Sequence, residues 1–371
     1  MSRLLDQITI IVPTYNRDFY ISRSCQYLST LGFPSIIVAD SSPEEKKSRH
    51  RDYIEKMKDP GIKFFGYPQN VTAFEKLYDV LNYVKTPYVV FCSDKDFPIA
   101  GGIEQALDFL INNPDYSIAD GHYFRTDVKD SEVSFHELYG AYHIPLQSSS
   151  SLQRVYTFMS DYFAVFYAVH RTELARKALK KYLDTFKGHY NEQFGELIPA
   201  SLDLCYGKYR RLDIPYWIRS AGPSFGSATP KLDTYAKSDE LSHLYIHFED
   251  LLTDSLLEIG EKSDRDHIRN ILKNSFRNYL AKHHMRPECY DFINPDTLLM
   301  KNPLIVSYRK LIRILTRGQD FLDRKIHGID IAAKNNSGMV FAQNEEMKKI
   351  TKWTLDFAGY LENDAMIPNE F

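Results

Sequence analysis

The stretch TPYVVFCSDKDF, residues 86–97, joins an apolar run to a short acidic turn. The run from Tyr88 to Cys92 is short, consists mostly of β-branched and aromatic residues and has polar neighbours, which predicts a buried strand. Asp94 and Asp96 follow the end of that strand directly. Because ligands of open α/β sheets bind beyond the carboxyl ends of the strands, these two aspartates are the first candidates for functional side chains.

Three further strands are predicted upstream of this stretch, and helical segments alternate with all four. The strand candidates are Ile8–Val12, Ser35–Ala39, Ile62–Tyr67 and Tyr88–Cys92. The predicted helices occupy residues 21–31, 43–57, 73–84 and 103–110. Such an alternation is typical of a mostly parallel sheet with covering helices, so the expected fold class is α/β.

The character of the sequence changes twice further along the chain. Residues 115–230 are less regular, and the apolar runs Tyr116–Ala119 and Phe163–Val169 predict further strands there. After residue 230, apolar residues recur at steps of three and four over long stretches, which predicts long amphipathic helices. The expected division is one domain over residues 1–230, with halves 1–114 and 115–230, and a mostly helical C-terminal region over residues 231–371.

Composition disfavours several classes of protein. The net charge of -3 provides no overall basic field for binding a phosphate backbone, so nucleic acid is not an expected partner. The four cysteines lack metal-finger spacing and are expected to be buried thiols in a reducing compartment. The first strand follows within a few residues of Met1, and no apolar stretch reaches the roughly 18 residues of a membrane span. A cytoplasmic protein is therefore expected.

Polar residues follow three of the predicted strands, at 13–17, 40–42 and 93–96. Neither GxGxxG nor GxxxxGK[ST] occurs in the sequence, so no backbone loop is predicted to hold phosphates. A divalent cation on Asp94 and Asp96 is another way to hold a diphosphate. The alternatives are a solvated turn for these two residues and a helix-capping turn for Asp40.

The three blocks ITIIVPTYNR (residues 8–17), IIVADSS (36–42) and TPYVVFCSDKDF (86–97) resemble the inverting family-2 glycosyltransferases of GT-A fold, in order and in spacing. The likeness is good over about the first 100 residues and weaker at residues 167–174 and 194–219. It implies a nucleoside-diphosphate sugar as donor, with UDP-sugars favoured, and Mn²⁺ or Mg²⁺ as cofactor.

The resemblance also implies roles for single residues. The residues expected at the nucleotide sugar are Pro13, Thr14, Tyr15, Arg17, Asp40, Asp94 and Lys95. Asp94 and Asp96 would be the metal motif. Many relatives carry a further Asp where this chain has Lys95, so either the cation is held less tightly or Lys95 contacts a phosphate; a solvated lysine is the alternative.

The catalytic base of the family lies in a helix well downstream, and Gly, Pro and a basic residue follow it. The residues in that order here are Glu196, Gly207, Pro215 and Arg219. The resemblance therefore implies Glu196 as the general base, although Leu197 replaces the Asp that usually follows.

Glu192 is the competing candidate for the base, and an ordinary surface glutamate is the alternative for both. Proline is tolerated in the first turn of a helix and not in its interior, so Pro199 predicts a helix that begins near Glu196. The positive end of the helix dipole would then keep the Glu196 carboxylate ionised.

These features together predict a metal-dependent inverting glycosyltransferase that acts on a hydroxyl of a glycan or lipid-linked glycan in surface polysaccharide synthesis. The alternatives are a nucleotidyltransferase, which usually has a Gly-rich basic loop near its first strand, and a non-catalytic sugar-binding module. Residues 301–325 are basic and amphipathic, which predicts either contact with the inner face of a membrane or a solvated helix face. The oligomeric state stays open.

Overall fold

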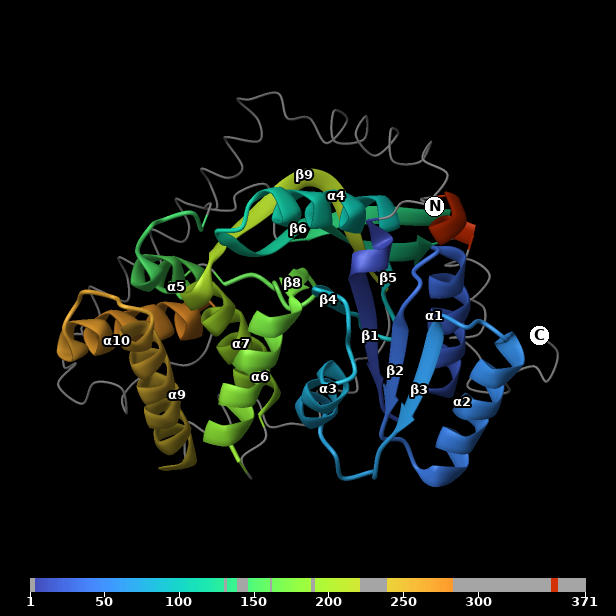
Figure 1. The fold of residues 1–371 in the computed structure, drawn as a ribbon, viewed down its shortest axis with the longest axis horizontal. Coiled ribbons are helices and arrows are strands. Elements are labelled where there is room, and N and C mark those ends of the chain that lie inside the picture. Colours follow the sequence, from blue (N-terminus) through green and yellow to red (C-terminus); the bar gives the residue numbers. More distant parts are fainter. Residues whose placement is uncertain are drawn as a thin grey trace.

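The structure is a computed structural model, and it describes residues 4–129, 132–138, 146–160, 162–187, 191–220, 239–282 and 348–352. Over these residues the chain forms one mixed sheet with helices on both of its faces (Figure 1). The α/β class predicted from the alternation of strands and helices is therefore confirmed.

The sheet has a parallel half and a mixed half. Its strands are β1 (Ile8–Thr14), β2 (Ile36–Asp40), β3 (Ile62–Gly66), β4 (Tyr88–Phe91), β5 (Phe97–Pro98), β6 (Tyr116–Lys129), β7 (Glu132–Leu138), β8 (Val169–Arg171) and β9 (Lys208–Arg219). Their order is β3-β2-β1-β4-β8-β6-β9-β5, and β7 pairs with β6. The first four strands are parallel, as predicted, whereas β8 is antiparallel to both β4 and β6 and β5 is antiparallel to β9.

Helices cover both faces of the sheet, and the described ones are a short 3-10 helix (Leu5–Gln7), α1 (Asp18–Thr30), α2 (Glu44–Met57), α3 (Ala73–Leu81), α4 (Ala100–Asn112), α5 (Ser151–Ser160), α6 (Thr172–Thr185), α7 (Glu192–Tyr206), α9 (Asp239–Glu258) and α10 (Arg265–Lys282). Successive side chains of a strand point to opposite faces. Ile10 and Val12 therefore pack with residues of α1, α2 and α4, while Ile11 packs with α3, α6 and α7. Because both faces are buried, β1, β2 and β4 are continuous apolar runs without polar alternation.

The C-terminal helices α9 and α10 extend one of these two cores. Phe194 of α7 stacks on Phe276 of α10 at a centroid distance of 5.9 Å and lies 5.7 Å from Phe248 of α9. In Figure 1 both helices lie beside α5 and α7, on the side away from β3. The helical character predicted for this region is confirmed for α9 and α10. The predicted boundary near residue 230 and the basic segment 301–325 lie outside the described residues.

The strand predicted at Phe163–Val169 is mostly wrong, because only Val169 belongs to a strand, β8. Rings in the run pack into an aromatic cluster instead: Phe166 stacks on Phe91 at 5.0 Å, and Phe163 lies 5.2 Å from Tyr209. The amide of Ala168 then closes a turn onto the carbonyl of residue 165 at 3.0 Å. A short apolar run does not by itself distinguish a strand from an irregular buried segment.

Candidate active site

The carboxyl ends of β1 and β4 meet at Asp94. Thr14, the last residue of β1, donates from Oγ1 to Asp94 Oδ2 at 2.8 Å. Arg17, which precedes α1, donates from Nη1 to Asp94 Oδ1 at 2.7 Å. Asp94 is buried, so solvent screens this ion pair only weakly. The structure thus brings together three of the residues that the sequence assigned to one site.

Asp40 ends β2 and lies opposite Thr14 in the sheet. Its carboxylate is fully buried; the amide of Ser42 donates to Oδ1 at 2.7 Å, and His50 Nδ1 lies 2.7 Å from Oδ2. Burial alone would raise the pKa of Asp40, but the hydrogen bonds from His50 and Ser42 outweigh it and lower that pKa. Asp40 is therefore an oriented anion at neutral pH.

The segment after β1 carries an exposed aromatic ring. Tyr15 is 44% exposed, and its hydroxyl accepts a hydrogen bond from Gln69 Nε2 at 3.1 Å. Asn16 has a φ of 58°, a left-handed conformation that asparagine tolerates, and its amide donates to Ser42 Oγ at 2.8 Å. Pro13 pairs with Ala39 inside the sheet. This turn therefore presents Tyr15 at the same edge as Asp40.

Lys76 of α3 belongs to this edge and was missed by the sequence analysis. It is buried, and its ammonium donates to the carbonyl of Thr14 and, at 2.9 Å, to Ser41 Oγ. Burial lowers the pKa of Lys76 to about 8, although the charges of Asp40 and Asp94 act to raise it. Lys76 occupies a position on the apolar face of α3, and a lysine there is the pattern that could have identified it.

Asp96 lies deeper than Asp94. Trp217 Nε1 donates to Asp96 Oδ2 at 3.2 Å, the amide of Ser220 donates to Oδ1 at 3.2 Å, and Arg219 Nε is 3.8 Å from Oδ2. The side chain has no exposed surface, and this burial raises the pKa of Asp96, although Arg219, Trp217 and Lys95 act to lower it. Lys95 is partly buried, and its own pKa is lowered by that burial.

Arg219 connects Asp96 to an aromatic surface and to α7. Its guanidinium lies 5.4 Å above the ring of Tyr167, which stacks on Trp217 at 5.3 Å. The positive charge of Arg219 also acts to lower the pKa of Glu196. Arg219 therefore acts electrostatically on both Asp96 and Glu196, which are 100 residues apart in the chain.

Glu196 projects from α7 toward Tyr162. The Tyr162 hydroxyl donates to Glu196 Oε2 at a long 3.5 Å, and Tyr162 packs edge to face against Tyr279 of α10 at 5.2 Å. Glu196 retains some exposed surface as a residue, but its carboxyl group is enclosed, and this burial raises its pKa. A carboxylate with a raised pKa and a weak hydrogen bond is suited to accept a proton.

The start of α7 differs from the prediction. The helix begins at Glu192, with Asn191 as its cap, so Pro199 lies inside the helix and Glu196 in its second turn. The Asn191 side chain accepts from the amide of Phe194 at 3.1 Å, which stabilises an earlier start than the proline suggested. The helix dipole consequently acts on Glu196 less than expected, since its effect is confined to the first turn. The Glu192 side chain lies outside the described ones.

Gly195, next to Glu196, is predicted to be required by packing. A Cβ at this position would lie 2.0 Å from Cε2 of the buried ring of Phe74. We expect Gly195→Ala to lower the free energy of unfolding by about 1–3 kcal/mol, as overpacking does, and this is measured by urea denaturation. The matched control is Gly66→Ala, whose nearest neighbour is the flexible Lys47 side chain at 3.2 Å. Equal stability of the two variants would contradict this packing.

The carboxylates of Asp94 and Asp96 suit a metal ion that a bound ligand also coordinates better than a metal ion held by protein side chains alone. Among the described residues, no group of three His, Cys, Asp or Glu side chains is arranged to hold a metal ion. Asp94 and Asp96 supply two carboxylates, and Mg²⁺ is commonly bound by one or two carboxylates together with waters and phosphate oxygens. The buried carboxyl of Asp96, whose pKa is raised, would be stabilised as an anion by such a cation.

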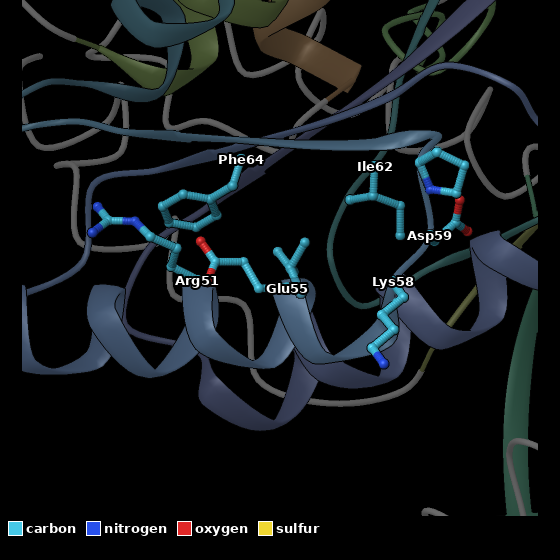
Figure 2. Close-up of a pocket in the computed structure, with 8 residues that line it drawn as sticks. Arg51, Glu55, Lys58, Asp59, Ile62 and Phe64 are labelled. Carbon is cyan, nitrogen blue, oxygen red and sulfur yellow. The ribbon is translucent and has the colours of Figure 1, made fainter.

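A surface pocket lies elsewhere on the parallel half of the sheet. Figure 2 shows Arg51 and Glu55 of α2 facing Phe64 of β3, with Lys58 and Asp59 near Ile62. Asp40 pairs with Gly66 at the carboxyl end of β3, whereas Ile62 is at its beginning. The pocket is therefore separate from the edge where Thr14, Asp40 and Asp94 meet.

Two solved structures are similar to this chain at low sequence identity. The crystal structure of S. aureus TarS in complex with UDP-GlcNAc is 13% identical in sequence, covers 74% of this chain and 73% of that chain, and gives a TM-score of 0.49. Mannosyltransferase PcManGT from Pyrobaculum calidifontis, in complex with GDP-Man and Mn²⁺, is 15% identical, covers 97% and 88%, and gives 0.41. A search of curated proteins found no match.

The match to a family model is more specific. It covers residues 9–182, which include β1 to β4, Asp94, Asp96 and most of α6. The GT-A type of α/β fold expected from the three sequence blocks is confirmed. The model that matches is that of glycosyl transferase family 2, and the match spans just under half of the chain.

Proposed function

We propose that this glycosyltransferase moves a sugar from a nucleoside-diphosphate sugar to an acceptor hydroxyl, with inversion at the anomeric carbon and with a divalent cation. The observation that carries the proposal is the position of Arg219, whose Nε lies 3.8 Å from Asp96 Oδ2 and whose charge also acts to lower the pKa of Glu196. The guanidinium of Arg219 thus acts electrostatically on both the candidate metal motif and the candidate base, which supports a single reaction centre for donor and acceptor.

The donor would bind at the carboxyl ends of β1, β2 and β4. Asp40 is an oriented anion that can accept hydrogen bonds from a ribose or a base, and Tyr15 offers an exposed ring for stacking. Lys95 lies between the two aspartates of the metal motif in sequence, and Arg17 donates to Asp94 at 2.7 Å, so both cationic side chains are candidates for contact with the phosphates. Mn²⁺ or Mg²⁺ held by Asp94 and Asp96 would neutralise charge on the leaving nucleoside diphosphate.

The acceptor would bind on the side of α7 and β9. Glu196 would take the proton of the attacking hydroxyl, which is the role of a general base. The stacked rings of Tyr167 and Trp217 lie beside Arg219, and such rings suit the C–H faces of a sugar. The Tyr162 hydroxyl donates to Glu196 Oε2 at a long 3.5 Å and so restricts the orientation of the carboxylate.

We further propose a glycan or lipid-linked glycan of a surface polysaccharide as the acceptor, and a UDP-sugar as the favoured donor. Both follow the family resemblance. No helix among the described residues is long and apolar enough to cross a membrane. Contact with a membrane surface through the basic segment 301–325 stays a prediction, which flotation with anionic liposomes at low salt would test.

Nucleotide binding is the first test of the proposal. We expect one of UDP, GDP, dTDP or CMP to raise the melting temperature in the presence of Mn²⁺ or Mg²⁺, because a ligand that binds only the folded state stabilises it by mass action. The measurement is a thermal-shift series with each nucleotide, with and without the metal. The absence of any shift at saturating nucleotide would contradict the donor site.

Product analysis separates the remaining alternatives. A glycosyltransferase releases a nucleoside diphosphate from the donor, either on transfer or on slow hydrolysis. A nucleotidyltransferase would release pyrophosphate from a nucleoside triphosphate and a sugar phosphate instead. A binding module would retain the nucleotide sugar intact at every metal concentration.

A further inference from the structure

His50 of α2 lies between two carboxylates from different elements. Its Nδ1 is 2.7 Å from Asp40 Oδ2 at the end of β2, and its Nε2 is 3.0 Å from Asp18 Oδ1 at the start of α1. The side chain is only 2% exposed. An ionised carboxylate only accepts hydrogen bonds, so both contacts can be satisfied at once only when both ring nitrogens carry a proton. The geometry therefore corresponds to an imidazolium.

The charges around the two carboxylates are distributed unequally. Asp18 also meets two cations of α2, Lys46 at 3.0 Å and Arg49 at 3.2 Å. Asp40 receives its other hydrogen bonds from the backbone and side chain of Ser42, and the ammonium of Lys76, on α3, is a further charge that acts on it. Asp18 thus keeps cationic partners if His50 becomes neutral, whereas Asp40 depends more on His50.

We propose that His50 is a positioning residue for the donor: as an imidazolium it holds the Asp40 carboxylate in the orientation that receives the nucleotide. This inference rests on the proposed function, which assigns Asp40 to the donor. His50 is too buried to touch a ligand itself. A neutral ring carries one unprotonated nitrogen that would face a carboxylate oxygen, so one of the two contacts and the positive charge next to Asp40 are lost, and the Asp40 carboxylate is held less firmly.

The direction of the pH dependence follows from the same contacts. Burial acts to lower the pKa of His50, but the hydrogen bonds and charges of Asp18 and Asp40 outweigh it and raise that pKa. The imidazolium contacts are therefore fully present below the ordinary histidine pKa of about 6.5 and are lost as the pH rises through the raised value. Both aspartates have lowered pKa values and stay ionised over this range. Nucleotide affinity should fall as the pH rises.

The experiment compares the wild type with His50→Asn, using UDP and GDP as probes with Mn²⁺. Asparagine can still donate one hydrogen bond toward Asp40 but cannot become charged. We expect the wild type to lose about tenfold in affinity between low and high pH, which corresponds to a shift of about one unit in the pKa of His50 upon binding. Any titration of the nucleotide itself affects both proteins equally, so it cancels in the ratio of the wild-type affinity to the His50→Asn affinity. His267→Asn, at an exposed position of α10, is the control and should behave as the wild type.

A second variant separates positioning from mere structural support. Asp18→Asn removes the carboxylate from Nε2 and should shift the midpoint of the affinity change to lower pH, with nearly unchanged affinity at low pH. NMR titration of the His50 ring should show a pKa that is higher in the nucleotide complex than in the free protein. If His50 had only a structural role, its replacement would change the stability of the protein. Asp18→Asn would then not move the midpoint of the affinity change, and nucleotide binding would not move the pKa of His50.

Two outcomes are decisive and distinguishable. If the wild type binds no nucleotide at any pH, the proposed function fails, and the role of His50 fails with it. If the wild type binds but its affinity ratio to His50→Asn is the same at every pH, or Asp18→Asn leaves the midpoint unchanged, only the positioning role of His50 is overturned.

Discussion

Replacing Glu196 with Gln is expected to lower turnover by about 10²–10⁴-fold, the usual contribution of a general base. Glutamine has nearly the same shape, so it keeps the packing next to Gly195 and the acceptor for the Tyr162 hydroxyl, but it cannot take a proton. Donor binding should be unchanged, because Glu196 lies on α7 and not at the carboxyl ends of β1, β2 and β4. Steady-state kinetics together with nucleotide titration measure both quantities.

The pH profile of the wild type gives an independent test of the same residue. A base must be ionised to act, and burial raises the pKa of Glu196, while Arg219 and Tyr162 act to lower it. Activity should therefore rise with pH through a pKa above the ordinary glutamate value of about 4.3. The remaining activity of Glu196→Gln should not show this rise with pH, because glutamine does not ionise.

Glu192→Gln is the matched control, since it makes the same change one turn earlier in the same helix. We expect near-native turnover from it. A near-native rate for Glu196→Gln combined with a large loss for Glu192→Gln would instead assign the base to Glu192.

Replacing Asp96 with Asn should abolish the metal-dependent part of nucleotide binding. Bound ligand stabilises a protein by about 2.7 kcal/mol at a concentration of about 100 Kd, and the share of this that requires Mn²⁺ or Mg²⁺ should disappear. Asparagine offers a neutral oxygen, which is a much weaker ligand for a hard cation than a carboxylate. Thermal shift with UDP or GDP, with and without the metal, measures the loss.

The free Asp96→Asn protein should be at least as stable as the wild type at neutral pH. Burial raises the pKa of Asp96, so the folded state binds its proton more tightly than the unfolded state does. The contribution of this protonation to the free energy of unfolding is lost as the pH rises through the raised pKa. A neutral amide does not carry that cost. Asp108→Asn, on the exposed face of α4, is the control for the substitution itself. Undiminished metal-dependent stabilisation in Asp96→Asn would refute the metal assignment.

The parallel half of the fold could be predicted because its determinants are local. Each of β1, β2 and β4 is buried on both faces and is therefore an apolar run, and the helix between β1 and β2 shows apolar residues at steps of three and four. The mixed half could not be predicted in the same way. β8 has three residues, and its position between β4 and β6 depends on partners that are distant in the chain.

The start of α7 shows a second limit of local patterns. Pro199 correctly marks a position without a backbone donor, but the cap at Asn191 and the packing of Gly195 on Phe74 hold the helix continuous through it. Tertiary contacts outweighed a local preference there. Glu196 consequently lies in the second turn, where its pKa is governed by burial and by Arg219 rather than by the helix terminus.

The sequence by itself determined the fold class, the family resemblance and the residues at the carboxyl ends of β1, β2 and β4, because strand ends are marked by the change from apolar to polar residues along the chain. Only the tertiary structure decided which charges face one another. The contacts of Lys76 with Thr14, of His50 with Asp18 and Asp40, and of Arg219 with Asp96 each join elements that are distant in sequence. The pKa of a buried group depends on its neighbours in space and on its exclusion from water, and neither is encoded in local spacing.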